Sequence, residues 1–299
     1  MGFAHIHHLI RPVDREVEMA KTILVTGATG KQGSGVVRAL SAISKNDGSF
    51  KILALTRNPS SDAAKALTTL PGVQVIQGDL DDPEPIFSAH KLDGVFSVQD
   101  YAAKDEAKQG IAIVDLSVKY KIGQLVYTGV DFAGQENTPL HHFETKRKIE
   151  ARIHSVPPDA LSWTIIRPVG FYENFYWDEW PKAVSTRFSP TANYKLIGCD
   201  DIGRVAAHVF SRPEAFNHKA IDLAADSLKQ ADIAKIWLDV TGKPLPNEKP
   251  NLPEAFDKNV EFNATHEFVA DVQENRRLFP FLTDFATWLR STPLAKDSQ

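Results

Sequence analysis

The sequence is poor in sulfur-containing residues. Its 299 residues include two methionines and a single cysteine, Cys199. One cysteine cannot form an intramolecular disulfide or a cysteine-based metal cage, so no metal site is predicted. A reducing compartment is expected, which means the cytoplasm or the nucleus.

Long apolar runs and an excess of positive charge are also missing. No apolar stretch approaches the roughly 18 residues that a membrane-spanning helix needs. The 34 basic residues are outnumbered by 38 acidic ones, which gives a formal net charge of −4 at pH 7. Proteins that bind nucleic acid directly usually carry a clustered positive surface. We therefore expect neither a membrane nor a direct nucleic-acid partner.

The remaining composition is ordinary for a globular protein, with 42% hydrophobic and 24% charged residues. From Lys21 onward, short apolar and β-branched runs alternate with helical patterns. Strands are expected over 22–26, 51–56, 73–77, 94–98, 124–128 and 163–167. Helices are expected between them over 34–44, 61–70, 104–119 and 145–154. This alternation predicts an α/β fold built on a doubly wound, parallel sheet of the Rossmann type.

The regular alternation ends after the sixth predicted strand. We expect residues 1–20 to form an N-terminal extension and residues 21–168 to form the Rossmann domain. Residues 169–299 are expected to form a smaller, mostly C-terminal α/β lobe that contacts a substrate or partner. Within that lobe, residues 201–224 are expected to return to the Rossmann domain as one helix and one strand.

A glycine-rich loop lies between the first predicted strand and the first predicted helix. Gly27, Gly30 and Gly33 follow the spacing of a phosphate-binding loop. One glycine permits a tight turn, another lets the backbone approach a pyrophosphate, and the third lets helix and strand pack closely. The free N–H groups of the helix N-terminus would bind the phosphates. The strand–loop–helix context predicts a dinucleotide site, to which Thr29 and Gln32 of the loop also belong.

The choice of cofactor is predicted from the end of the second strand. Sites that prefer NAD place an acidic residue there, whereas NADP sites tend to place an arginine for the 2′-phosphate. This strand ends with Arg57 and has no acidic residue. Arg57 can pair with a phosphate through two hydrogen bonds, and Lys31 of the loop adds a second positive charge. NADP(H) is therefore the predicted cofactor; the alternative is that Arg57 is only an exposed surface residue.

Four further positions are predicted to line the same site, because ligands bind outside the carboxyl ends of parallel strands. Asp79 and Leu80 follow the third strand and are expected beside the adenine. Gln99 follows the fourth strand and is expected near the ribose and nicotinamide. Thr128 ends the fifth strand.

These motifs resemble the NmrA-like branch of the atypical short-chain dehydrogenases/reductases, which is named for fungal regulators of nitrogen metabolite repression. The resemblance extends over residues 22–289. The segments that carry it are 27–33, 55–57, 78–80, 142–146, 165–168, 171–175, 201–203 and 228–242. The resemblance implies an NADP(H)-binding Rossmann fold.

Ordinary members of the wider family use a Tyr-x-x-x-Lys pair. The lysine lowers the pKa of the tyrosine and orients the nicotinamide ribose, and the tyrosine donates a proton as hydride reaches the substrate. In this chain Lys146 is at the lysine position, but His142 replaces the tyrosine. Thr128 is at the supporting Ser/Thr position. Lys146 is thus a candidate for both cofactor binding and catalysis, and the usual proton donor is absent.

Three hypotheses follow from this departure. In the first, NADP(H) occupancy changes the shape of the protein, and a protein partner such as a transcription factor responds. In the second, the chain is an NADPH-dependent oxidoreductase for a small aromatic or apolar carbonyl or enone substrate. It would rely on Lys146, as the similar isoflavone- and phenylpropanoid-type reductases do, with His142, at an ordinary pKa of about 6.5, as a candidate proton donor. In the third, Lys146 only binds the ribose and His142 only packs.

An aromatic cluster follows the sixth strand, at the active-site end of the sheet. Its members are Phe171, Tyr172, Phe175, Tyr176, Trp177 and Trp180. Phe171, Tyr172 and Phe175 are candidate contacts for a substrate or a partner, and the amide of Asn174 could orient a ligand. The alternative is that the cluster forms the core between the two lobes, since aromatic residues dominate both cores and interfaces.

Overall fold

The computed structural model describes residues 20–100 and 103–296. The predicted extension over 1–20 lies outside the described residues, apart from Ala20. Within the described part, the main sheet has seven strands in the order β3-β2-β1-β4-β5-β6-β9, and every neighbouring pair is parallel. The strands are β1 (Lys21–Val25), β2 (Phe50–Thr56), β3 (Val73–Gln77), β4 (Gly94–Ser97), β5 (Gln124–Thr128), β6 (Trp163–Pro168) and β9 (Lys219–Leu223). The predicted α/β fold with a doubly wound parallel sheet is confirmed.

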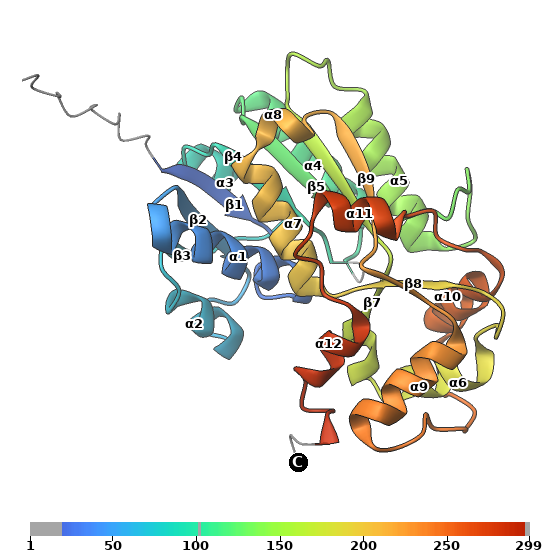
Figure 1. The fold of residues 1–299 in the computed structure, drawn as a ribbon. Helices are drawn as coiled ribbons and strands as arrows, with labels where there is room; N and C mark the ends of the chain where they lie inside the picture. The colour runs from blue at the N-terminus through green and yellow to red at the C-terminus, as the bar shows by residue number, and fades with distance from the viewer. Residues whose placement is uncertain (1–19, 101–102, 297–299) are drawn as a thin grey trace, which may run out of the picture.

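Helices cover both faces of this sheet (Figure 1). They are α1 (Lys31–Asp47), α2 (Asp62–Thr68), α3 (Glu84–Ala89), α4 (Glu106–Lys119), α5 (His141–His154), α7 (Cys199–Ser211) and α8 (Pro213–Phe216). Ile23 and Val25 of β1 are buried in one core cluster with α1 and α7, whereas Leu24 is buried with α4 and α5. Successive residues of a strand point to opposite faces of the sheet, so each buried strand contributes side chains to the core on both faces.

Two helices begin earlier than the sequence pattern predicts. Helix α1 begins at Lys31, whereas the sequence pattern predicts a start at residue 34. The predicted start is late because Gly33 and Gly35, which are poor helix formers, lie inside the first turns of α1. Helix α5 begins at His141 rather than at residue 145. His142 therefore lies in the first turn of α5, and Lys146 follows one turn later on the same side of the helix.

The smaller lobe is more regular than expected. Its three-stranded sheet contains β7 (Gly170–Phe171), β8 (Tyr194–Ile197) and β10 (Asp226–Leu228). Its helices are η1 (Tyr172–Tyr176), α6 (Glu179–Arg187), α9 (Gln230–Thr241), α10 (Glu254–Thr265) and α12 (Phe285–Arg290). Helix α11 (Val272–Leu278) lies instead at the end of β9, where the side chain of Asn275 accepts a 2.7 Å hydrogen bond from the N–H of Ala224. Pro181 lies in the first turn of α6 and Pro253 directly precedes α10, so these prolines begin helices instead of breaking them.

Helix α7 connects the smaller lobe to the start of α1. A Cβ atom on Gly203 of α7 would lie 2.2 Å from the carbonyl carbon of Gly35. A Cβ on Gly35 would lie 2.9 Å from the carbonyl oxygen of Cys199. The backbones of the two helices therefore touch directly after the glycine loop. After α7 and α8 the chain enters β9, which pairs with β6.

Candidate functional site

The glycine loop has a conformation that only glycine satisfies. Gly27 has a φ of +55°, and a Cβ atom there would lie 2.7 Å from Cγ1 of Val98. A Cβ on Gly33 would lie 2.2 Å from the carbonyl oxygen of Gly27. That carbonyl also accepts a 2.9 Å hydrogen bond from the N–H of Gly30. The loop therefore presents bare backbone at the N-terminus of α1.

In the part of the chain that the structure describes, no side chain caps the N-terminus of α1. Its N-cap, Gly30, makes no side-chain capping bond, and the first turn contains no acidic residue. Lys31 is exposed beside it, and Thr29 is half-buried in the loop. An uncapped helix N-terminus with exposed N–H groups attracts an anion. These residues fit the pyrophosphate of a dinucleotide.

The carboxyl end of β5 is tied to the glycine loop. The hydroxyl of Thr128 donates a 2.8 Å hydrogen bond to Oε1 of Gln32. Thr128 is buried, so this bond fixes the side chain of Gln32 against the sheet. The two residues were predicted separately, from the loop and from the end of β5, and the structure brings them together.

Arg57 extends from the end of β2 with 72% of its side chain exposed. Its guanidinium lies 3.6 Å from the carboxylate of Asp100, which follows β4. This pairing was not anticipated, because Asp100 is distant in sequence. Exposed ion pairs contribute little stability, so Arg57 remains able to bind a phosphate.

The other predicted positions lie at neighbouring strand ends. Asp79 is exposed after β3, and its carboxylate accepts a 3.0 Å hydrogen bond from the N–H of Asp81. Leu80 packs against the core beneath α3 and α4. Gln99 is buried after β4, where its amide donates a 2.8 Å hydrogen bond to the hydroxyl of Ser97. These contacts hold all three residues at the carboxyl edge of the sheet.

Lys146 of α5 forms an ion pair with Glu106, which begins α4. Only 15% of the lysine side chain and 3% of the glutamate side chain are exposed. The hydroxyl of Thr145 donates to the other oxygen of the same carboxylate. Sequence reasoning missed Glu106, because it lies on another helix and outside any motif.

His142 does not have the ordinary properties of a histidine. Burial, followed by the positive charge of Lys146, lowers the pKa of His142 from 6.5 to about 4. Its ring contacts Phe143 edge-on at 4.8 Å. The imidazole is therefore neutral at physiological pH. A general acid has to carry a proton that it can donate, so a neutral imidazole does not suit this role. This pKa differs from the value near 6.5 that the sequence-based hypothesis assumed for His142.

The lowered pKa of His142 predicts a loss of stability in acid. In the unfolded chain the histidine keeps its ordinary pKa and takes up a proton as the pH falls below about 6.5, whereas the folded protein resists protonation down to about pH 4. Between pH 7.5 and 4.5, wild type should lose about 2–3 kcal/mol more unfolding free energy than His142→Gln. Urea denaturation at the two pH values measures this difference.

The neighbouring His141 provides a matched control, because it is exposed on the same helix turn. His141→Gln should leave the pH dependence of stability unchanged. Identical acid sensitivity of wild type and His142→Gln would contradict the burial of a neutral imidazole.

A buried tyrosine lies close to the Lys146–Glu106 pair but cannot replace the missing proton donor. Tyr127 of β5 is 1% exposed, and its hydroxyl has no hydrogen-bond partner among the described residues. Burial, reinforced by the charge of Glu106, raises the pKa of Tyr127 well above its ordinary value. Its hydroxyl is enclosed in the protein interior, out of contact with solvent.

Two of the predicted substrate or partner contacts lie in the core. Tyr172 has no exposed surface, and its hydroxyl donates a 3.2 Å hydrogen bond to the carbonyl of Thr283. Phe175 is 2% exposed and lies 4.7 Å from the ring of Phe285 in α12. Neither side chain offers a surface to a ligand in this structure, because α12 covers both. Tyr172, Phe175 and Trp180 of the aromatic cluster thus belong to the core, whereas Tyr176 is 50% exposed.

Phe171 and Asn174 differ from these two residues because they are half-buried. The backbone carbonyl of Asn174 accepts a 3.0 Å hydrogen bond from the N–H of Trp177. Phe171 pairs with Ile197 in the small sheet. Both residues keep part of their surface available at the beginning of the lobe.

The model of the NmrA-like family matches residues 19–279. The chain belongs to the NmrA-like family.

Relatives of this NmrA-like chain cover most of its length. An NmrA-like family domain-containing protein of Dictyostelium discoideum is 29% identical over 246 residues, which are 75% of this chain and 79% of that protein. An NmrA-like family domain-containing oxidoreductase of Penicillium ochrochloron is 26% identical over 270 residues, 79% of this chain and 78% of its own.

A solved structure of NmrA, a negative transcriptional regulator in complex with NADP, has the same fold as this NmrA-like chain. The TM-score is 0.74 at 16% identity, over 92% of this chain and 96% of NmrA. At this identity, the likeness shows the fold of the chain.

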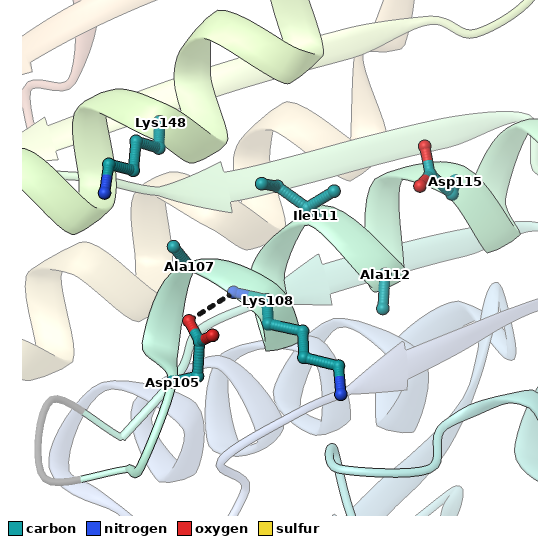
Figure 2. Close-up of a pocket in the computed structure, with 7 residues that line it drawn as sticks. All are labelled: Asp105, Ala107, Lys108, Ile111, Ala112, Asp115 and Lys148. Carbon is teal, nitrogen blue, oxygen red and sulfur yellow. Dashed lines mark hydrogen bonds between the residues drawn. The ribbon is translucent and has the colours of Figure 1, made fainter.

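Two hollows in this NmrA-like chain lie away from the glycine loop. A shallow groove of about 460 Å³ on the outer side of α4 is bounded by Lys148 of α5 (Figure 2). A smaller cavity of about 20 Å³ in the smaller lobe is lined by Trp180, Tyr194 and His266, among others. The smaller cavity has room for about one water molecule. None of the residues predicted to bind cofactor, substrate or partner lines either hollow.

Within residues 20–100 and 103–296 of this NmrA-like chain, no helix is both long and apolar enough to cross a bilayer. Among the same residues, no group of three or more His, Cys, Asp or Glu side chains could hold a metal ion.

Proposed function

We propose that this chain binds NADP(H). The observation that carries the proposal is the uncapped N-terminus of α1 behind a glycine loop in which added Cβ atoms would collide with backbone. Arg57 and Lys31 supply exposed positive charge on the same side, where a 2′-phosphate and a pyrophosphate would bind. When bound, NADPH would supply a hydride to a substrate, and NADP⁺ would accept one.

We further infer that the chain is a redox-responsive regulator that acts on a protein partner, such as a transcription factor, in the cytoplasm or the nucleus. The missing proton donor supports this inference, since His142 is neutral and Tyr127 is enclosed. The direct backbone contact between Gly35 and Gly203 supports it as well, because it connects the loop to the smaller lobe. A sensor needs only different affinities of its two shapes for the reduced and oxidised cofactor.

The second candidate function is an NADPH-dependent oxidoreductase for a small aromatic or apolar carbonyl or enone. The fixed position of Lys146 favours it, because an ammonium held near the reacting centre stabilises negative charge that develops on a substrate oxygen. The relative from Penicillium ochrochloron carries the name oxidoreductase. In this case the proton would come from solvent rather than from His142.

A pair of assays distinguishes the two functions. Calorimetric titration compares the affinities for NADPH and NADP⁺, and absorbance at the NADPH band follows turnover with quinones, enones and aromatic aldehydes. A regulator should discriminate between the two cofactor forms and consume no NADPH. An oxidoreductase should consume NADPH, and Lys146→Ala should abolish turnover while NADPH still binds measurably. Unchanged turnover in Lys146→Ala would refute the role of the lysine in the reaction.

A further inference from the structure

One carboxylate at the start of α4 engages two consecutive residues of α5. Oε1 of Glu106 accepts from Nζ of Lys146, and Oε2 accepts from the hydroxyl of Thr145. Lys146 and Thr145 both belong to the second turn of α5. The ammonium group is thus bound to a carboxylate that is itself held by α5.

This ion pair is more deeply buried than the others. In the described residues no other ion pair has both side chains exposed by 15% or less. Burying two charges costs free energy that their mutual attraction only partly offsets, so stability alone does not explain the pair. Helix capping does not explain it either, because Asp105 already caps α4 by accepting a 2.9 Å hydrogen bond from the N–H of Lys108.

The pair joins two segments that begin at the carboxyl edge of the sheet. Helix α4 follows the segment after β4 that contains Gln99 and Asp100, and α5 follows the segment after β5 that begins at Thr128. This is the edge at which the glycine loop and Arg57 also lie, and at which ligands bind in such sheets. Glu106 therefore restrains the ammonium of Lys146 at the edge where the cofactor is proposed to bind.

We propose that Glu106 is a positioning residue that fixes the ammonium of Lys146 for the nicotinamide ribose of NADP(H). This inference rests on the proposed function, because it requires that the chain bind NADP(H). A lysine side chain has a flexible stem of four carbons and loses conformational freedom when it binds a ligand. Glu106 orders that side chain before the cofactor binds, so binding involves a smaller loss of conformational entropy.

A double-mutant cycle in NADPH affinity tests this inference by calorimetry. Glu106→Gln should weaken NADPH binding by about 3- to 10-fold, because an ordered side chain becomes free. Lys146→Met, which keeps the apolar stem, should weaken it by about 10-fold or more through loss of a charged hydrogen bond. The double variant should bind no more weakly than Lys146→Met alone, because Glu106 acts only through the lysine.

Lysine labelling and a matched control variant support the cycle. Trace acetylation followed by mass spectrometry should label Lys146 faster in Glu106→Gln than in wild type. The matched control is Glu84, which pairs with Lys119 on the exposed surface of α3 and α4. Glu84→Gln should change neither the NADPH affinity nor the labelling of Lys146. If Glu106→Gln does not fold, Glu106→Asp keeps the charge but shortens its reach, and should show the same coupling to Lys146.

The outcomes separate the inference from the proposed function. If wild type binds no NADPH, the proposed function fails. If NADPH binds and Lys146→Met weakens it, but the Glu106 variants have no effect or an effect that adds fully to that of Lys146→Met, the positioning role is refuted.

Discussion

Replacing Gly33 by alanine is expected to abolish measurable NADPH binding. The new Cβ would lie 2.2 Å from the carbonyl oxygen of Gly27, 2.6 Å from its carbonyl carbon and 2.9 Å from the carbonyl oxygen of Thr26. All three atoms are backbone, so no side-chain rotation relieves the overlap. The loop has to separate from α1, and the N–H groups that would bind the pyrophosphate lose their common direction. Calorimetry should show a loss of more than about 100-fold in affinity.

Gly48 provides the control for this substitution, because it is a glycine of positive φ with no atom within 4 Å of an added Cβ. Gly48→Ala should cost about 1 kcal/mol of unfolding free energy through backbone strain alone, and should leave NADPH affinity unchanged. Urea denaturation of Gly33→Ala shows whether the variant remains folded. A folded Gly33→Ala with wild-type NADPH affinity would disprove the phosphate role of the loop.

Arg57→Ala is expected to remove the preference for the phosphorylated cofactor. A charged hydrogen bond to the 2′-phosphate contributes about 1.5–3 kcal/mol, so NADPH affinity should fall by roughly 10- to 100-fold. NADH lacks this phosphate, and its affinity should not change. The exposed pair of Arg57 with Asp100 gives little stability, so the variant should fold normally. Titration of both cofactors at the same ionic strength measures the effect.

Arg38 on α1 is a suitable comparison, because it also forms an exposed ion pair with an aspartate, Asp200. Arg38→Ala should leave the affinities for both cofactors close to those of wild type. An equal loss of NADPH and NADH affinity in Arg57→Ala would show that Arg57 acts on a part of the cofactor common to both, or on the fold.

The features predicted from the sequence are those encoded by nearby residues. Buried parallel strands appear as short apolar runs, so β1 to β6 were expected close to their observed positions. The glycine loop is also local, since Gly27 to Gly33 define both the turn and the helix start. Helix α3 was missed, because six residues are too few for a helical period to emerge.

The features that escaped prediction depend on residues brought together by the fold. Glu106 contacts Lys146, 40 positions away in the sequence, and Asp100, in the segment after β4, lies beside Arg57. The lowered pKa of His142 arises from burial and from the charge of Lys146, neither of which a motif reveals. Tyr172 was a candidate ligand contact because it is aromatic and follows the sixth strand, but α12 covers its side chain.

The most direct test of the proposed cofactor site is calorimetric titration of the wild-type protein with NADPH and with NADH. We predict one site per chain that prefers NADPH by about 10-fold or more, because Arg57 recognises the 2′-phosphate. Equal affinities would contradict the choice of NADP(H), and the absence of binding to either would contradict the site itself.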